Sequence, residues 1–118
     1  MPIVFVFEPD LIFASKFEGF SRLTGTDFKI FSGFDEFTQA ARENMPKALI
    51  LNLDLMDSER LINLTHGYHV LGYYSHINSN IARDAKQMGI DYVVARRAFV
   101  LNAPSLINQL LDFKTLAL

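Results

Sequence analysis

The chain has 118 residues, half of them hydrophobic, and a formal net charge of −2 at pH 7. A chain of this size forms one domain whose core needs no disulfide, and the lack of cysteine excludes disulfides, thiolate zinc sites and thiol nucleophiles. The slight negative charge lacks the excess of Lys and Arg with which proteins bind the nucleic-acid backbone, so we expect no direct nucleic-acid partner.

The amino-terminal residues lack the features of a targeting signal. The apolar run at 3–7 is too short for a signal peptide, no basic segment precedes it, and no later run reaches the length of a membrane span. We therefore expect a cytoplasmic protein without membrane contact. We also expect the residues 1–118 to form a single domain, with 113–118 as a C-terminal tail.

The first predicted elements are a strand, a helix and an edge strand. The apolar residues 3–7 are typical of a buried strand, and Asp10 can cap a helix that ends before Gly25. Residues 27–33 form a more polar strand. Its Lys29 suits the edge of a sheet, because a charge there discourages pairing with another molecule.

The middle of the chain continues this alternation. A helix with one apolar stripe precedes Pro46, and the apolar segment 48–53 predicts a buried strand. A short helix follows, with Asp57 or Ser58 as its cap, and extends to Gly67.

The last third of the chain repeats the pattern. Residues 69–74 predict a fourth strand, and the helix after it has cap candidates at 78–80 and stops at Gly89. Residues 92–95 predict the last strand. The last helix has Asn102 as its cap and a proline in its first turn.

The alternation as a whole predicts the fold class. Five strand–helix units joined by right-handed crossovers make an α/β domain, with five helices and a doubly wound sheet of five parallel strands in the flavodoxin-like order 2-1-3-4-5. In such a sheet a ligand site lies outside the carboxyl ends of the strands, next to strands one and three. The residues that follow the strands are therefore the candidates for a functional site.

Three stretches resemble the receiver domains of two-component response regulators, the CheY-like family. They are "PIVFVFEPDLI" (2–12), "PKALILNLDLMD" (46–57) and "MGIDYVVARRAF" (88–99), and the resemblance extends from Pro2 to Phe113. A phosphorylatable receiver has two acids after strand one, an acceptor aspartate at the end of strand three, a Ser or Thr after strand four and a Lys after strand five. The carboxylates hold Mg²⁺, the acceptor attacks phosphorus, and the hydroxyl and ammonium neutralise the phosphoryl oxygens.

The first half of that pattern is changed in this chain. Without gaps, the two acids fall on Phe7 and Glu8, and the phosphoryl acceptor falls on Asn52. Asn52 has a neutral amide without a nucleophilic oxygen, Phe7 cannot coordinate a cation, and Glu8 alone is a weak Mg²⁺ site. The resemblance therefore implies a degenerate receiver, or pseudo-receiver, with no catalytic residue, no metal and no cofactor.

The second half of the pattern departs as well. The hydroxyl position falls on Tyr74, with Ser75 beside it, and Tyr74 is bulky enough to fill the space of a phosphoryl group. The lysine position falls on Arg96, or on Ala95 if one residue is missing from the turn before it. The predicted degenerate phosphorylation pocket therefore consists of Phe7, Glu8, Asn52, Asp54, Tyr74, Ser75 and Arg96.

Two other functions are open at this point. Asp54 lies two residues beyond Asn52 and faces the same way in an extended strand, so a shifted register would make it a displaced phosphoryl acceptor. The apolar strand gives no reason for such a shift, which would change the depth of every residue in the sheet. The third hypothesis is a small-molecule sensor that uses the vacated pocket under Phe7 and Tyr74.

The resemblance also implies a surface for partners. In receivers the fourth helix, the fifth strand and the fifth helix form a face that binds partners or a second copy. Here that face is locally basic and includes Arg and Tyr, types enriched at binding hot spots: Arg83, Lys86, Gln87, Tyr92, Arg96 and Arg97. An ordinary solvated face is the alternative. The predicted function is a non-catalytic, phosphorylation-independent signalling module whose partner is a kinase, an output domain, a localisation factor or a second copy of the chain.

Overall fold

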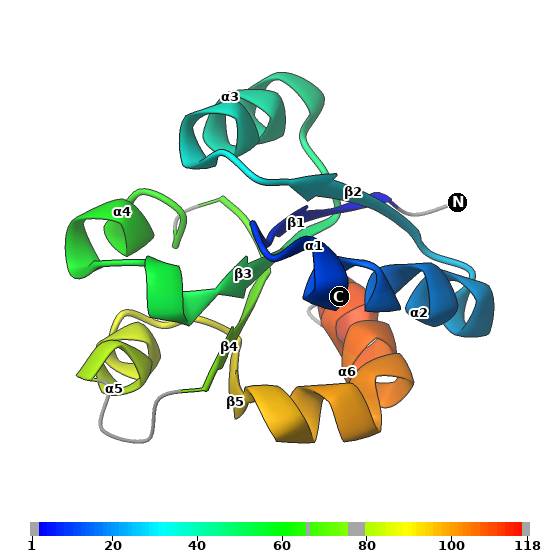
Figure 1. Ribbon diagram of the computed structural model, residues 1–118. Helices are drawn as coiled ribbons and strands as arrows, with labels where there is room; N and C mark the ends of the chain where they lie inside the picture. The colour runs from blue at the N-terminus through cyan, green and yellow to red at the C-terminus, as the bar shows by residue number, and fades with distance from the viewer. Residues whose placement is uncertain (1–2, 66, 76–79, 117–118) are drawn as a thin grey trace.

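The structure is a computed structural model, and it describes residues 3–65, 67–75 and 80–116, with side chains up to residue 112. Within these ranges five parallel strands form one sheet in the order β2-β1-β3-β4-β5 (Figure 1). The strands are β1 (Ile3–Phe7), β2 (Asp27–Phe31), β3 (Ala48–Asn52), β4 (Val70–Tyr74) and β5 (Tyr92–Ala95). The predicted fold class, the order 2-1-3-4-5 and the polar edge strand are confirmed.

Helical segments connect the strands and cover both faces of the sheet (Figure 1). One face is covered by α1 (Leu11–Ala14), α2 (Lys16–Thr24) and α6 (Arg96–Leu116). The other face is covered by α3 (Phe34–Asn44), the short 3-10 helix η1 (Leu53–Leu55), α4 (Ser58–Ile62) and α5 (Asn80–Gln87). Among the described residues, no helix is both long enough and apolar enough to cross a membrane.

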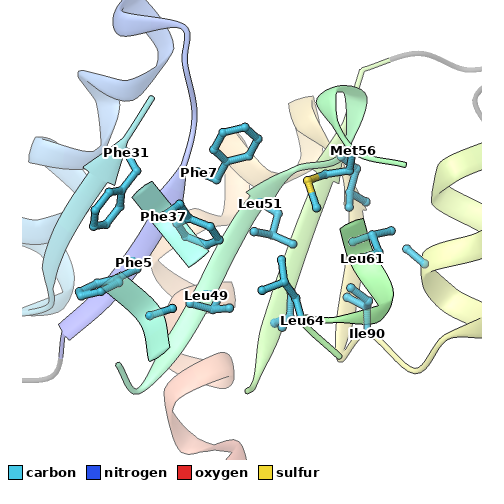
Figure 2. Packing of buried hydrophobic residues seen from close by; sticks show 14 residues of the cluster. Phe5, Phe7, Phe31, Phe37, Leu49, Leu51, Met56, Leu61, Leu64 and Ile90 are labelled. Atoms are coloured by element: carbon cyan, nitrogen blue, oxygen red, sulfur yellow. The ribbon is translucent and has the colours of Figure 1, made fainter. Parts of the chain in front are cut away.

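Side chains of the strands point alternately to the two faces, so that each face has its own hydrophobic core. In the core under α3, α4 and α5, Phe7 packs with Phe37 (Figure 2). In the core under α1, α2 and α6, the ring of Phe17 lies 5.3 Å from that of Phe20 and 5.9 Å from that of Phe99, between centroids. Full burial of each such side chain stabilises the folded protein by about 1.5–3 kcal/mol, so the many phenylalanines of the sequence serve the packing of the two cores.

The first predicted helix is interrupted after one turn. Asp10 caps it as predicted, because its Oδ1 accepts from the backbone N of Ile12 at 2.9 Å and of Phe13 at 3.2 Å. The break falls at Ser15, whose hydroxyl donates to the carbonyl of Ile12 at 2.6 Å and so competes with the helical hydrogen bonds. The predicted stop is confirmed at the end of α2, where Gly25 adopts the left-handed region with φ of 70°.

The helix after β3 is shorter than predicted. It begins at Ser58 and its cap is Asp57, whose side chain accepts from the backbone of the first turn. It ends at Ile62, well before Gly67. The cap candidates 78–79 of the following helix lie outside the described residues.

The last helix is longer than predicted. A helical stretch that was not predicted begins at Arg96, directly after β5. Asn102 has non-helical backbone angles and divides α6 into two helical stretches at a kink, so the predicted helix start at Asn102, with Pro104 in the first turn, is confirmed. The helix continues to Leu116, whereas we expected a tail over 113–118.

Candidate functional site

The carboxyl ends of β1, β3 and β4 bring Glu8, Asn52 and Tyr73 together. The register pairs Phe7 of β1 with Leu51 of β3, and Asn52 with Tyr73 of β4. Glu8 directly follows β1, and its backbone N still donates to the last carbonyl of β2 at 3.0 Å. Glu8 is completely buried, with an exposed fraction of 0%. A carboxylate in this position must find its hydrogen-bond donors inside the protein.

Neutral donors occupy both carboxylate oxygens of Glu8. The amide nitrogen Nδ2 of Asn52 donates to Oε1 at 3.0 Å and to Oε2 at 3.1 Å. The hydroxyl of Tyr73 donates to Oε1 at 2.7 Å, and the backbone N of Asp10 donates to Oε2 at 3.1 Å. The backbone N of Asp54 donates to Oδ1 of Asn52 at 3.0 Å, which orients the amide with its nitrogen toward Glu8.

These residues do not fit the Mg²⁺ that the receiver resemblance implies. Mg²⁺ requires an octahedral set of oxygen ligands, whereas the groups that face Glu8 are N–H and O–H donors. Phe7, at the position of the other acid, is buried with its ring centroid 5.4 Å from that of Phe34 and 5.8 Å from that of Phe37. In the described part of the chain, no group of three or more His, Cys, Asp or Glu could hold a metal ion.

Tyr73, and not the predicted Tyr74, brings a hydroxyl to this site. Its fully buried ring is stacked on Phe99 of α6 at a centroid distance of 5.2 Å and tilted against Phe13 of α1 at 5.1 Å. Burial, followed by the hydrogen bond to Glu8 and the charge of that carboxylate, raises the pKa of Tyr73 far above its usual range. Tyr74 is half-buried and packs against the opposite core, under α3, α4 and α5.

Asp54 and Ser75 form a second pair next to this site. Asn52 caps η1, and Asp54 in η1 lies at the carboxyl end of β4. The backbone N of Ser75 donates to Oδ2 of Asp54 at 3.0 Å and to Oδ1 at 3.2 Å, and the hydroxyl of Ser75 donates to Oδ2. Asp54, the alternative phosphoryl acceptor of the sequence analysis, is therefore half-buried and bound to Ser75.

Arg96 reaches toward α1 at the rim of the site. Its guanidinium carbon Cζ lies 3.8 Å from the centroid of the Phe13 ring, and Nη2 lies 3.8 Å from Oδ2 of Asp10. Of the two candidates for the lysine position, Ala95 is the last residue of β5 and pairs with Tyr74, and Arg96 is the first residue of α6. Arg96 thus joins α6 to α1 by a cation–π contact and an ion pair.

The predicted partner face is exposed in part. Four of its members have exposed side chains, three on α5 and one in the first turn of α6: Arg83, Lys86, Gln87 and Arg97. Tyr92 is half-buried against the core of α1, α2 and α6, and Arg96 turns to α1. The exposed residues of this face are therefore three cations and one amide.

Comparison with solved structures shows that the chain has the fold of response-regulator receiver domains. A response regulator receiver domain protein from Clostridium thermocellum matches with a TM-score of 0.84 at 15% identity, over 100% of both chains. A CheY-like receiver domain protein from Methanospirillum hungatei gives 0.77 at 12% identity, over 98% of this chain and 97% of that one. The RcsB response regulator of Salmonella typhimurium gives 0.80 at 10% identity, over 93% of this chain and 61% of that one. No protein-family model matches the sequence, and no curated protein does.

Proposed function

We propose that this chain is a non-catalytic, receiver-like signalling module that acts through protein–protein contacts and does not depend on phosphorylation. The observation that carries the proposal is the saturation of Glu8 by neutral donors. The resemblance puts phosphoryl transfer at the carboxyl ends of β1 and β3. In this chain the polar side chains at that position, Glu8, Asn52 and Tyr73, are hydrogen-bonded to one another.

Phosphoryl transfer requires a nucleophile, a divalent cation and space for the phosphoryl group, and the contacts at the carboxyl ends of β1 and β3 disfavour it. Asn52 has no nucleophilic oxygen, and both ends of its amide are engaged, one by Glu8 and the other by the backbone of Asp54. Phe7 supplies no cation ligand, and the hydroxyl of Tyr73 donates a hydrogen bond to Glu8. These contacts support a module that signals without a phosphoryl group.

The same contacts argue against a small-molecule sensor under Phe7 and Tyr74. Both side chains pack against the core of α3, α4 and α5. A hollow of about 630 Å³ lies instead at the opposite end of the sheet, next to Ile3 and Asp27, the first residues of β1 and β2. We therefore propose no ligand at the carboxyl ends of the strands.

The exposed basic residues on α5 and α6 support a partner with an acidic surface. Arg83, Lys86 and Arg97 are exposed on a chain whose formal net charge is −2, and Arg83 also pairs with the half-buried Asp84 at 4.0 Å, so the fully exposed charges of α5 and the first turn of α6 are basic. Complementary charge steers association and selects partners. We propose a signalling kinase, an output domain, a localisation factor or a second copy of the chain as the partner, presenting acidic residues to this face in the cytoplasm.

Intact-mass spectrometry after incubation with Mg²⁺ and acetyl phosphate tests the loss of phosphorylation. We expect the wild-type chain to gain no phosphoryl group under conditions in which a phosphorylatable receiver, run in parallel, is modified. An adduct on the wild type that disappears in Asp54→Asn would establish the displaced acceptor and refute the proposal.

Cross-linking in cells tests the partner face. The single variants Arg83→Glu and Lys86→Glu each reverse one charge on α5, and Lys16→Glu reverses one charge at an exposed position of α2, in the opposite helical layer. We expect each α5 variant to lose cross-linked partners that the wild type and Lys16→Glu retain. Equal capture by the wild type and all the variants would contradict a role for this face.

A further inference from the structure

Asp54 and Ser75 close a ring of hydrogen bonds that joins the ends of β1, β3 and β4. From Glu8 the ring passes to Nδ2 of Asn52 at 3.0 Å. Oδ1 of Asn52 accepts from the backbone N of Asp54 at 3.0 Å, and the Asp54 carboxylate accepts from Ser75 at 3.0 Å. Two residues before Ser75, the hydroxyl of Tyr73 returns to Glu8 at 2.7 Å. The end of β4 is thus tied to the ends of β3 and β1.

Packing holds Asp54 in this ring independently of the hydrogen bonds. Leu53, the residue before it, is fully buried and lies over Gly72 of β4. A Cβ atom at Gly72 would lie 2.6 Å from Cγ and 2.7 Å from both methyl carbons of Leu53, closer than nonbonded carbons approach. The glycine therefore lets η1 press against β4, and this contact sets the position of the Asp54 carboxylate.

The carboxylate of Asp54 takes both donors that Ser75 can offer. The backbone N–H and the side-chain O–H of Ser75 both donate to it. Hydrogen bonds to a charged acceptor are stronger than those between neutral groups. Ser75 itself is exposed, so without Asp54 its two donors would turn to water. The negative charge next to the end of β4 is therefore supplied by the Asp54 side chain of the protein itself.

We propose that Asp54 is a positioning residue, an internal anion that latches the carboxyl end of β4 through Ser75 and keeps the module in one conformation without phosphorylation. The inference rests on the proposed function and deepens it, because it names what holds the site in place. Two of the exposed basic residues, Arg83 and Lys86, lie on α5, which follows β4 in the chain. A further bond, from the hydroxyl of Ser58 to Oδ2 of Asp84 at 3.2 Å, ties α5 to α4.

Residue-level amide exchange measured by NMR tests the latch. Asp54→Ala removes the acceptor, and Asp54→Asn keeps an acceptor oxygen but removes the charge. We expect exchange of the Ser75 amide to rise about tenfold or more in Asp54→Ala and by a smaller factor in Asp54→Asn, because the lost bond has a charged acceptor. The amides at the start of α5 should follow the same order, whereas those of β1 and β2 should stay unchanged.

Asp57→Asn is the matched control, since the Asp57 carboxylate also follows β3 and accepts from a backbone N–H, but it caps α4 and does not contact Ser75. It should loosen α4 and leave the Ser75 amide as in the wild type. Unchanged protection of Ser75 in Asp54→Ala would overturn the latch, and so would an equal rise across all strands. No phosphoryl donor is present in this experiment, so its failure rejects the latch alone, whereas a phosphoryl adduct in the mass experiment rejects the proposed function.

Discussion

Asn52→Asp is the substitution that most directly tests the description of Glu8. In the wild type, Nδ2 of Asn52 donates to the two carboxylate oxygens at 3.0 and 3.1 Å. The variant replaces this donor by an oxygen at about the same distance from a carboxylate that is completely buried. One favourable contact is lost, and a repulsive one takes its place.

The magnitude follows from both changes. Loss of a hydrogen bond to a charged group costs about 1.5–3 kcal/mol. Two unit charges about 3–4 Å apart repel by about 4–6 kcal/mol at an effective dielectric constant of about 20. Because the two carboxylates can share a proton, that repulsion is relieved in part, and we expect a net destabilisation of about 3–5 kcal/mol at neutral pH. The loss should be smaller in acid, where protonation of one carboxylate removes the repulsion.

Urea denaturation of wild type and variant, at neutral and at acid pH, measures this difference. Asn108→Asp is the control, because it makes the same chemical change at an exposed position of α6 and should stay within about 0.5 kcal/mol of the wild type. A domain of this size has a total stability of about 5–15 kcal/mol, so the shift is large enough to measure. If Asn52→Asp were as stable as Asn108→Asp at neutral pH, the reasoning on a saturated, buried Glu8 would be refuted.

Two further substitutions test the surroundings of the site. Tyr73→Phe removes the hydroxyl bound to Glu8 and should cost about 1.5–3 kcal/mol in the same assay. Because the pKa of Tyr73 is raised in the folded state, its contribution is complete below its ordinary pKa of 10.0 and is lost as the pH rises above that value. The gap between wild type and variant should therefore shrink above pH 10, and a constant gap would contradict the assignment. Gly72→Ala should cost about 1–3 kcal/mol and weaken protection of the Ser75 amide, because Leu53 must move. Gly19→Ala, with nothing within 4 Å of the new methyl group, should instead stabilise α2 by about 0.5–1 kcal/mol, and equal effects of the two changes would rule out the contact with Leu53.

The arrangement of the strands was accessible from the sequence because burial on two faces leaves a strong pattern. Apolar runs such as 48–53 alternate with single-stripe helices, and Lys29 marks the polar edge strand. The helix start at Asn102 was also accessible, because an asparagine two residues before a proline favours a cap. The helical stretch from Arg96 to the kink was missed.

The site was predictable only as far as strand ends determine it. Glu8 and Asn52 were expected near each other because they end neighbouring strands, and they are hydrogen-bonded. Alignment to a family pattern pointed to Tyr74, whereas the alternation of side chains along β4 turns Tyr73 toward α1 and α6. Tyr73 pairs with Asn52 in the strand register, and it is this tyrosine whose hydroxyl reaches Glu8.

The bond between Asp54 and Ser75 could not be foreseen in the same way. It depends on a one-turn helix after β3 and on the close approach that Gly72 permits to Leu53. Contacts of this kind arise from tertiary packing and leave no periodic pattern in the residues that make them.

The ring of hydrogen bonds around Glu8 has an evolutionary consequence, which is strong epistasis. A carboxylate introduced at Asn52 alone meets Glu8 without a cation between them, and one introduced at Phe7 alone is buried among aromatic rings. Either substitution alone is therefore expected to give a less stable protein, and the effect of one depends on whether the other is present. The hydrogen bonds of Glu8 and the aromatic packing of Phe7 thus couple the two positions, so that selection for stability alone favours the residues now present.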